Sequence, residues 1–299
     1  MHSANVYFFL FYRYKISNLV EENIYVDIFL GLTVAAVNLF LYPSFSNNYE
    51  TYYLCFMRIL TFLYTVWATF WFVFLFILLF PFFWLFLQKP ELKPKAHFLN
   101  RLWGRILFPI IGIRIKVQYE SELDLGKTYV FCSNHFSYLD IAVMGVIIKN
   151  YFAFVGKASL KGVPLFGYMF AKLHIQVDRT DKNSRVTSMT RSIKALQNGR
   201  SVMIFPEGGI WSKEFPKMSL PLKDGGFAMA IQQQIPIVPI SLLNNYKIMP
   251  DGHFAIYPQT IKAIVHQPIE TTGMTSDDIE DLKTKFYKVV QGALDGYSK

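Results

Sequence analysis

The feature that most constrains this chain is a run of 29 consecutive uncharged residues from Ile59 to Leu87, of which 20 are Leu, Ile, Phe or Val. About 20 apolar residues are enough to cross the hydrocarbon layer as a helix, so the run predicts a membrane segment. Because it is longer than one upright span needs, Pro81 is expected to kink it or to turn its end along the interface. We assign residues 57–95 to a membrane anchor and a polar linker, the latter over residues 88–95.

Basic residues flank this run unequally. Arg58 alone stands close before it, whereas five basic residues follow it closely: Lys89, Lys93, Lys95, Arg101 and Arg105. The cytoplasmic flanks of membrane helices carry the excess of Lys and Arg. The sequence therefore predicts a protein of the cell membrane whose C-terminal body, the catalytic part if the chain is an enzyme, lies on the cytoplasmic face.

Residues 1–56 form an N-terminal extension with a weaker pattern. Only 15 uncharged residues run from Ile28 to Tyr42, which leaves room for one further membrane segment but falls short of a full span. A cleaved signal peptide fits poorly, because Arg13 and Lys15 come after an aromatic run instead of before it.

The excess of basic residues lies in the second part of the chain. The 299 residues carry 30 Lys and Arg against 21 Asp and Glu, and residues 100–299 hold 24 and 16 of these. A basic body favours an anionic membrane face, an acidic ligand or nucleic acid as partner. Because no nucleic-acid-binding motif accompanies the charge, we expect a lipid bilayer and no nucleic acid.

The two cysteines give no sign of a disulfide or a metal site. Cys55 and Cys132 are 77 residues apart, which indicates reduced thiols. Cys132 stands three residues before a histidine, and a nucleophilic thiol is one interpretation. A small apolar side chain inside a strand is the favoured one.

Short β-rich runs alternate with helical ones after the linker. Apolar residues follow helical spacing from Val186 to Leu196 and again from Ile279 to Val289. Such alternation is typical of an α/β fold with a mostly parallel sheet flanked by helices, with functional groups at the strand ends. We assign residues 96–299 to this domain. Strands are expected over residues 116–119, 128–133, 152–155, 174–177, 201–205, 237–242 and 261–265.

A histidine and an aspartate stand five residues apart directly after one expected strand, in the segment Asn134-His-Phe-Ser-Tyr-Leu-Asp140. At a strand-to-helix turn the carboxylate of Asp140 can fold back on one imidazole nitrogen of His135, which leaves the other nitrogen as a general base. The carboxylate would also fix the tautomer and stabilise the imidazolium. Taken alone, such a pair is more often a structural hydrogen bond.

Two further segments place functional groups at strand ends. The expected strand 201–205 runs into Pro206-Glu-Gly-Gly209, a turn that presents a carboxylate and backbone N–H groups. Lys157 and Arg179 follow two other expected strands, where cations can meet an acidic substrate. Taken singly, an ordinary tight turn and solvated cations explain these residues as well.

Together, and in this order, the segments resemble the glycerolipid acyltransferase family, whose best-known members are 1-acylglycerol-3-phosphate acyltransferases. The family's NHxxxxD block resembles Asn134–Asp140, and its block of a Lys with a later Asp-Arg is similar to Lys157–Arg179. Its FPEG block corresponds to Phe205–Gly208, and its hydrophobic block around a proline is similar to Ile237–Ile240. The motif core covers residues 128–243 of the domain.

The resemblance implies a reaction of phospholipid biosynthesis. In it, His135 removes the proton of an acceptor hydroxyl, Asp140 orients the imidazole, and the hydroxyl oxygen attacks the thioester of acyl-CoA or acyl-acyl-carrier protein directly. No metal and no cofactor are implied; the partners are the lipid bilayer, a lysolipid acceptor and the acyl thioester. The residues expected to bind substrate are Asn134, Lys157, Arg179, Glu207, Gly208 and Gly209.

One departure from the family bears on the acceptor. FPEG commonly continues with Thr-Arg, whose arginine is offered to the acceptor phosphate, whereas here Gly209-Ile-Trp211 follows. Either Lys157 holds the phosphate with help from Arg179 or Lys213, or the acceptor has no phosphate, as in lyso-aminolipids. We favour 1-acylglycerol-3-phosphate over a non-phosphate lysolipid or another hydroxyl acceptor. The alternative outside enzymes, an inactive lipid-binding scaffold, would have lost the His or the Asp.

Overall fold

The computed structural model describes residues 49–252 and 254–298. It divides into two compact units, residues 1–63 and residues 64–299. The further membrane segment expected between Ile28 and Tyr42 lies outside the described residues. The unit of residues 64–299 holds the predicted α/β fold and every candidate site residue.

The apolar run forms one uninterrupted helix, α3 (Tyr49–Phe86). Its segment Leu54–Phe86 is long and apolar enough to cross a membrane, as the sequence predicts. Pro81 lies inside the helix instead of ending it, and the rings of Phe76 and Phe83 stack across this turn with centroids 5.6 Å apart.

From Tyr64 onward, α3 has two different faces. One face is part of the hydrophobic core of the α/β unit through Ala68, Leu75, Phe76 and Phe83. The other face carries exposed apolar side chains: Trp67, Phe70, Phe74, Ile77, Leu78, Phe82, Trp84 and Leu85. Because the helix is apolar all round, its sequence gives no sign of which face packs on the protein.

The polar segment expected to be a linker is largely helical. A short 3₁₀ turn, η1 (Pro90–Leu92), leads directly into α4 (Lys93–Ile110). Pro90 and Pro94 both stand in the first turn of their helices, where a missing N–H is tolerated and the fixed φ suits the start of a helix. These prolines start helices instead of marking an extended linker.

The sheet has seven strands in the order β1-β7-β6-β2-β5-β3-β4. Each corresponds to an expected strand, with ends that differ by at most two residues: β1 (Ile115–Tyr119), β2 (Val130–Ser133), β3 (Phe152–Lys157), β4 (Ile175–Val177), β5 (Ser201–Ile204), β6 (Ile237–Leu242) and β7 (Ile261–Val265). All neighbouring pairs are parallel except β6 and β7. The predicted mostly parallel sheet is thus confirmed, and the carboxyl ends of β2 to β6 share one edge.

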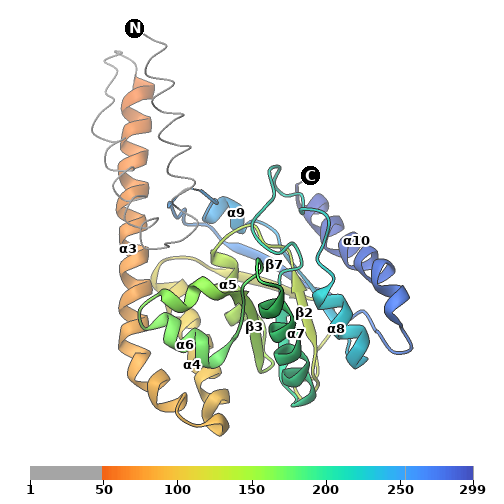
Figure 1. Ribbon diagram of the computed structural model, residues 1–299. Coiled ribbons are helices and arrows are strands. Elements are labelled where there is room, and N and C mark those ends of the chain that lie inside the picture. The colour runs from red at the N-terminus through yellow and green to blue at the C-terminus, as the bar shows by residue number, and fades with distance from the viewer. Residues whose placement is uncertain (1–48, 253, 299) are drawn as a thin grey trace. The chain divides into compact units, whose positions relative to one another are not determined.

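Helices cover both faces of the sheet (Figure 1). The other helices are α5 (Leu139–Ile147), η2 (Ala158–Gly162), α6 (Phe166–Leu173), α7 (Lys182–Gln197), α8 (Gly225–Gln233), α9 (Asn245–Ile248), η3 (Ser276–Asp278) and α10 (Ile279–Ser298). One core lies between the sheet and α3 to α6, and a second lies between the sheet and α7, α8 and α10. Strand β2 alternates between them, because Phe131 belongs to the first and Val130 and Cys132 to the second.

Two helices follow their predicted apolar faces with one exception each. Val186 of α7 is 59% exposed, whereas Met189 and Ile193 pack against the second core and Leu196 is buried in it. In α10 the buried side chain after Phe286 is Val290 and not Val289. The buried residues recur every four positions in both helices, at Ser188, Ser192 and Leu196 and at Leu282, Phe286 and Val290.

Candidate active site

His135 and Asp140 meet at the carboxyl end of β2. His135 lies in the turn after the strand, and Asp140 lies in the first turn of α5. The imidazole Nδ1 is 2.9 Å from Oδ2 of the carboxylate. Asp140 is fully buried, whereas His135 keeps 9% of its surface exposed. With Nδ1 held by the carboxylate, Nε2 is the nitrogen left for a substrate.

Four hydrogen bonds surround the Asp140 carboxylate. Besides the imidazole, Oδ2 accepts the main-chain N–H groups of Phe136 at 2.8 Å and Ser137 at 3.0 Å. Oδ1 accepts a bond of 2.8 Å from Nδ2 of Asn245, at the start of α9. Both oxygens of the carboxylate are thus held by hydrogen-bond donors.

Glu207 lies behind His135 and is 2% exposed. Its Oε1 accepts the main-chain N–H of His135 and its Oε2 accepts that of Ser219, both at 2.7 Å. Burial raises the pKa of this carboxyl to about 7, against the opposing effect of the two N–H donors. Glu207 therefore joins the turn after β2 to the segment after β5, with both oxygens directed to the protein.

The side chain of Asn134 also forms its hydrogen bonds within the protein. Its Nδ2 donates to the Leu242 carbonyl at 3.0 Å, and its Oδ1 accepts the Leu242 N–H at 2.8 Å. The side chain thus extends the pairing of β2 with β6 by one step and is fully buried. Asn134 and Glu207, both expected to bind substrate, are placed as supports of the turn that carries His135.

The predicted cations lie at the same edge of the sheet. Lys157 ends β3 and is exposed, and Arg179 follows β4. Nη1 of Arg179 donates to the carbonyl of Gly208, in the turn after β5. A guanidinium therefore reaches the turn whose sequence lacks the arginine usual after FPEG.

The two glycines of this turn are needed there for different reasons. Gly208 has a φ of +79°, in the left-handed region that other residues rarely adopt. A Cβ on Gly209 would lie 2.5 Å from the indole nitrogen of Trp211, so a larger residue would displace that ring. The exposed Trp211 therefore lies directly on the turn that Arg179 contacts.

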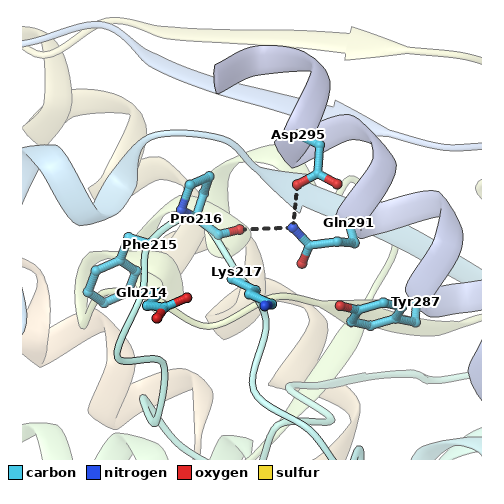
Figure 2. A pocket seen from close by; sticks show the side chains of 7 residues that line it. All are labelled: Glu214, Phe215, Pro216, Lys217, Tyr287, Gln291 and Asp295. Atoms are coloured by element: carbon cyan, nitrogen blue, oxygen red, sulfur yellow. Dashed lines mark hydrogen bonds between the residues drawn. The ribbon is translucent and has the colours of Figure 1, made fainter. Parts of the chain in front are cut away.

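A pocket lies beside the segment that follows this turn, against α10 (Figure 2); it is lined by Glu214, Phe215, Pro216, Lys217, Tyr287, Gln291 and Asp295. Gln291 donates to the Pro216 carbonyl at 3.3 Å and accepts the Met218 N–H at 2.9 Å. On its other side, Phe215 stacks on Tyr246 with centroids 5.0 Å apart. The pocket does not include the His–Asp pair. The segment 214–217 that forms one wall of it is held by Gln291 on one side and by Tyr246 on the other.

Sequence reasoning missed Asn245. The residue is 105 positions from Asp140 in the chain, so no local motif links the two. The one available signal was its place, because Asn244 and Asn245 follow strand β6 as the other site residues follow theirs.

Cys132 is buried in β2, and burial raises the pKa of its thiol far above the usual range. Because only a thiolate is an effective nucleophile, we expect iodoacetamide to leave Cys132 unmodified in the folded chain and to alkylate it after unfolding in guanidinium chloride. Peptide mass spectrometry reads out both states. Rapid alkylation of Cys132 in the folded chain would restore the nucleophilic-thiol interpretation.

Known proteins resemble this chain in both sequence and fold. Residues 114–243 match the family model described as Acyltransferase. The chloroplastic 1-acyl-sn-glycerol-3-phosphate acyltransferase LPAT1 of Arabidopsis thaliana is 33% identical over 192 residues, which are 63% of this chain and 52% of that protein. The 1-acyl-sn-glycerol-3-phosphate acyltransferase of Saccharomyces cerevisiae is 28% identical over 197 residues, 64% of each. The chain spans about half the length of the first of these relatives.

The crystal structure of PlsC from Thermotoga maritima, a 1-acyl-sn-glycerophosphate acyltransferase, has the same fold. Its TM-score is 0.67 at 19% identity, over 81% of this chain and 97% of that one. The likeness extends to the α/β fold that carries the His–Asp pair at its strand ends. Residues 114–243 match the Acyltransferase family model, and the resemblance expected from the sequence is confirmed.

Proposed function

We propose that this chain is a membrane-bound O-acyltransferase that moves a fatty acyl group from a thioester to the free hydroxyl of 1-acylglycerol-3-phosphate, giving phosphatidic acid. The observation that carries the proposal is the 2.9 Å contact between His135 and Asp140 at the carboxyl edge of the parallel strands. The names of the related proteins support the choice of acceptor.

In the proposed reaction, Nε2 of His135 takes the proton of the acceptor hydroxyl as its oxygen attacks the thioester carbonyl. A neutral alcohol is a poor nucleophile at neutral pH, so a positioned base is needed. The tetrahedral intermediate then expels the thiol of CoA or of an acyl carrier protein, and the imidazolium returns the proton to sulfur. Asp140 stabilises the imidazolium while it exists.

The turn after β5 is the proposed place for the developing oxyanion. The N–H of Gly208 already donates to the Phe205 carbonyl at 3.0 Å, which leaves the N–H of Gly209 as the candidate donor. A preorganised backbone donor of this kind stabilises charge that forms only in the transition state.

Lys157 and Arg179 are the proposed contacts of the acceptor phosphate. Replacing Lys157 by alanine should raise KM for 1-acylglycerol-3-phosphate about tenfold with little change in kcat, since a hydrogen bond to a charged group contributes about 1.5 kcal/mol to uniform binding. Steady-state kinetics with the exposed neighbour Lys161→Ala as control measures this. A KM that stays the same in Lys157→Ala and in Arg179→Ala would argue for an acceptor without phosphate.

Membrane attachment is proposed for the exposed apolar face of α3. Its Trp and Phe side chains suit the interface and the acyl region of a bilayer. The basic residues that follow, from Lys89 to Arg105, suit the anionic cytoplasmic leaflet of the cell membrane. A lysolipid acceptor resides in that bilayer, so attachment raises its encounter rate with His135.

A lysolipid without phosphate is the second candidate acceptor, because Gly209-Ile-Trp211 replaces the usual arginine. The contact of Arg179 with Gly208 compensates in part for the missing arginine, since it brings a cation to the turn. Lipid extracts of cells depleted of the protein separate the two candidates. We expect 1-acylglycerol-3-phosphate to accumulate; accumulation of a lyso-aminolipid instead would favour the second candidate.

A further inference from the structure

Among the described residues, Asn245 makes the one hydrogen bond to the Asp140 carboxylate that comes from outside the segment 135–140. The residue is fully buried at the start of α9, directly after β6. Its Nδ2 donates to Oδ1 of Asp140 at 2.8 Å, while Oδ2 takes the bonds from within that segment. The orientation of the carboxylate plane is thereby fixed at both oxygens.

The other end of the Asn245 amide offers no second reason for an asparagine at this position. Its Oδ1 is buried and has no hydrogen-bond partner among the residues that the structure describes. An unpartnered buried acceptor is unfavourable, and an apolar side chain of similar size would avoid it. Such a side chain would leave Oδ1 of Asp140 without its donor. The hydrogen bond that the amide donates to Asp140 therefore explains why an asparagine stands at position 245.

The surrounding contacts hold α9 firmly against the turn of His135. Ser137 Oγ donates to the Met249 carbonyl at 2.8 Å, and the ring of Phe136 packs edge-on against that of Tyr246. Asn244, the preceding residue, is also buried, but its side chain has different hydrogen-bond partners. Its amide pairs with the Thr260 carbonyl and the Lys262 N–H, both at 2.9 Å. Two adjacent asparagines thus differ in whether they touch the His–Asp pair.

We propose that Asn245 is a positioning residue of the His135–Asp140 pair. Its N–H group keeps the carboxylate oriented so that Oδ2 stays on Nδ1 of the imidazole, and the tautomer with Nε2 open to the substrate is maintained. The inference rests on the proposed general-base role of His135. It adds a third residue, from the end of a different strand, to the pair that the sequence motif contains.

The sharpest test replaces the amide by an isosteric acid in Asn245→Asp. Two adjacent carboxylates do not both ionise readily, so the new acid keeps its proton at low pH and donates it to Asp140 as the amide did. When it ionises at higher pH, repulsion displaces Asp140. We expect kcat near the wild-type value at low pH and at least ~10-fold lower at high pH, the lower range of effects seen when a group that orients a metal-bound histidine or carboxylate is removed.

Asn244→Asp is the matched control, because it introduces the same buried acid one residue away without touching Asp140. It should keep the pH profile of the wild type, and the same loss in both variants would overturn the proposal. Thermal unfolding checks that each variant is folded. If Asn245→Asp does not fold, Asn245→Leu is used instead and should lower kcat about tenfold with KM values unchanged; an unchanged kcat there would also overturn the proposal.

A second measurement needs no substrate. In the full chain labelled with ¹⁵N-histidine, the Nδ1 resonance of His135 reports its hydrogen bond to Asp140. We expect Asn245→Leu to shift this resonance and Asn244→Leu to leave it in place; equal spectra for both variants would overturn the proposal. Failure of the proposed function is distinct, because it would appear as unchanged transfer in a variant that lacks His135.

Discussion

Replacing His135 by alanine is expected to lower acyl transfer at least ~100-fold, the lower end of general-base effects. The reason is that the acceptor hydroxyl loses the only imidazole that the structure places at the carboxyl edge of β2 with a nitrogen free for substrate, within the described residues. The purified variant is assayed with radiolabelled acyl thioester and 1-acylglycerol-3-phosphate. Its unfolding temperature and its recovery in the membrane fraction should stay near those of the wild type.

His266 offers a control of similar chemistry in a different place. Its Nδ1 contacts Oε1 of Glu120 at 3.0 Å, and its Nε2 contacts Oγ of Ser241 at 2.8 Å. Both ring nitrogens are thus engaged, so the residue has none to offer a substrate. We expect His266→Gln to retain transfer, after correction for folded fraction, whereas equal losses in the two variants would argue against a special role of His135.

Replacing Asp140 by asparagine should lower kcat by roughly 1,000-fold or more, as loss of the carboxylate from a His–Asp pair does through the wrong tautomer and an unstabilised imidazolium. All four neighbours of the carboxylate donate hydrogen bonds to it, and an amide has one oxygen with which to accept them. The NH₂ group of the new side chain would meet a donor, and Asn245 can respond by turning its own amide. The fold should therefore survive.

Single-turnover kinetics with saturating acyl thioester measures the loss in Asp140→Asn. KM for the acceptor should change little, because Asp140 is buried behind the imidazole and has no surface for substrate. A variant that keeps kcat within tenfold of the wild type would show that the carboxylate serves the fold and not the reaction.

Much of the fold was predictable because its signals are local. Seven short β-rich runs separated by helical periods were enough to indicate every strand and a mostly parallel sheet. The contact of His135 with Asp140 was predictable for the same reason, because five residues at a strand-to-helix turn leave few conformations for the pair. In each case the sequence distance is short and the periodicity is clear.

The features that were missed depend on contacts between distant segments. The apolar run of α3 looked like a free membrane span, yet Phe83 and Leu87 are core residues of the α/β unit. Glu207 was recognised as a carboxylate at a strand end, but not as the acceptor of the Ser219 N–H. Residue type and spacing tell what a side chain can do, whereas its partners are decided by packing across the sheet.

One assay tests the proposed chemistry most directly. The purified wild-type chain, in lipid vesicles, is given a radiolabelled acyl thioester and, in parallel reactions, 1-acylglycerol-3-phosphate, lyso-aminolipids and lysolipids with other head groups. We expect labelled phosphatidic acid from the first acceptor, with release of one thiol for each acyl group transferred. Release of thiol without any acylated lipid, or acylated lipid formed equally well by His135→Ala, would contradict transfer to a hydroxyl activated by this imidazole.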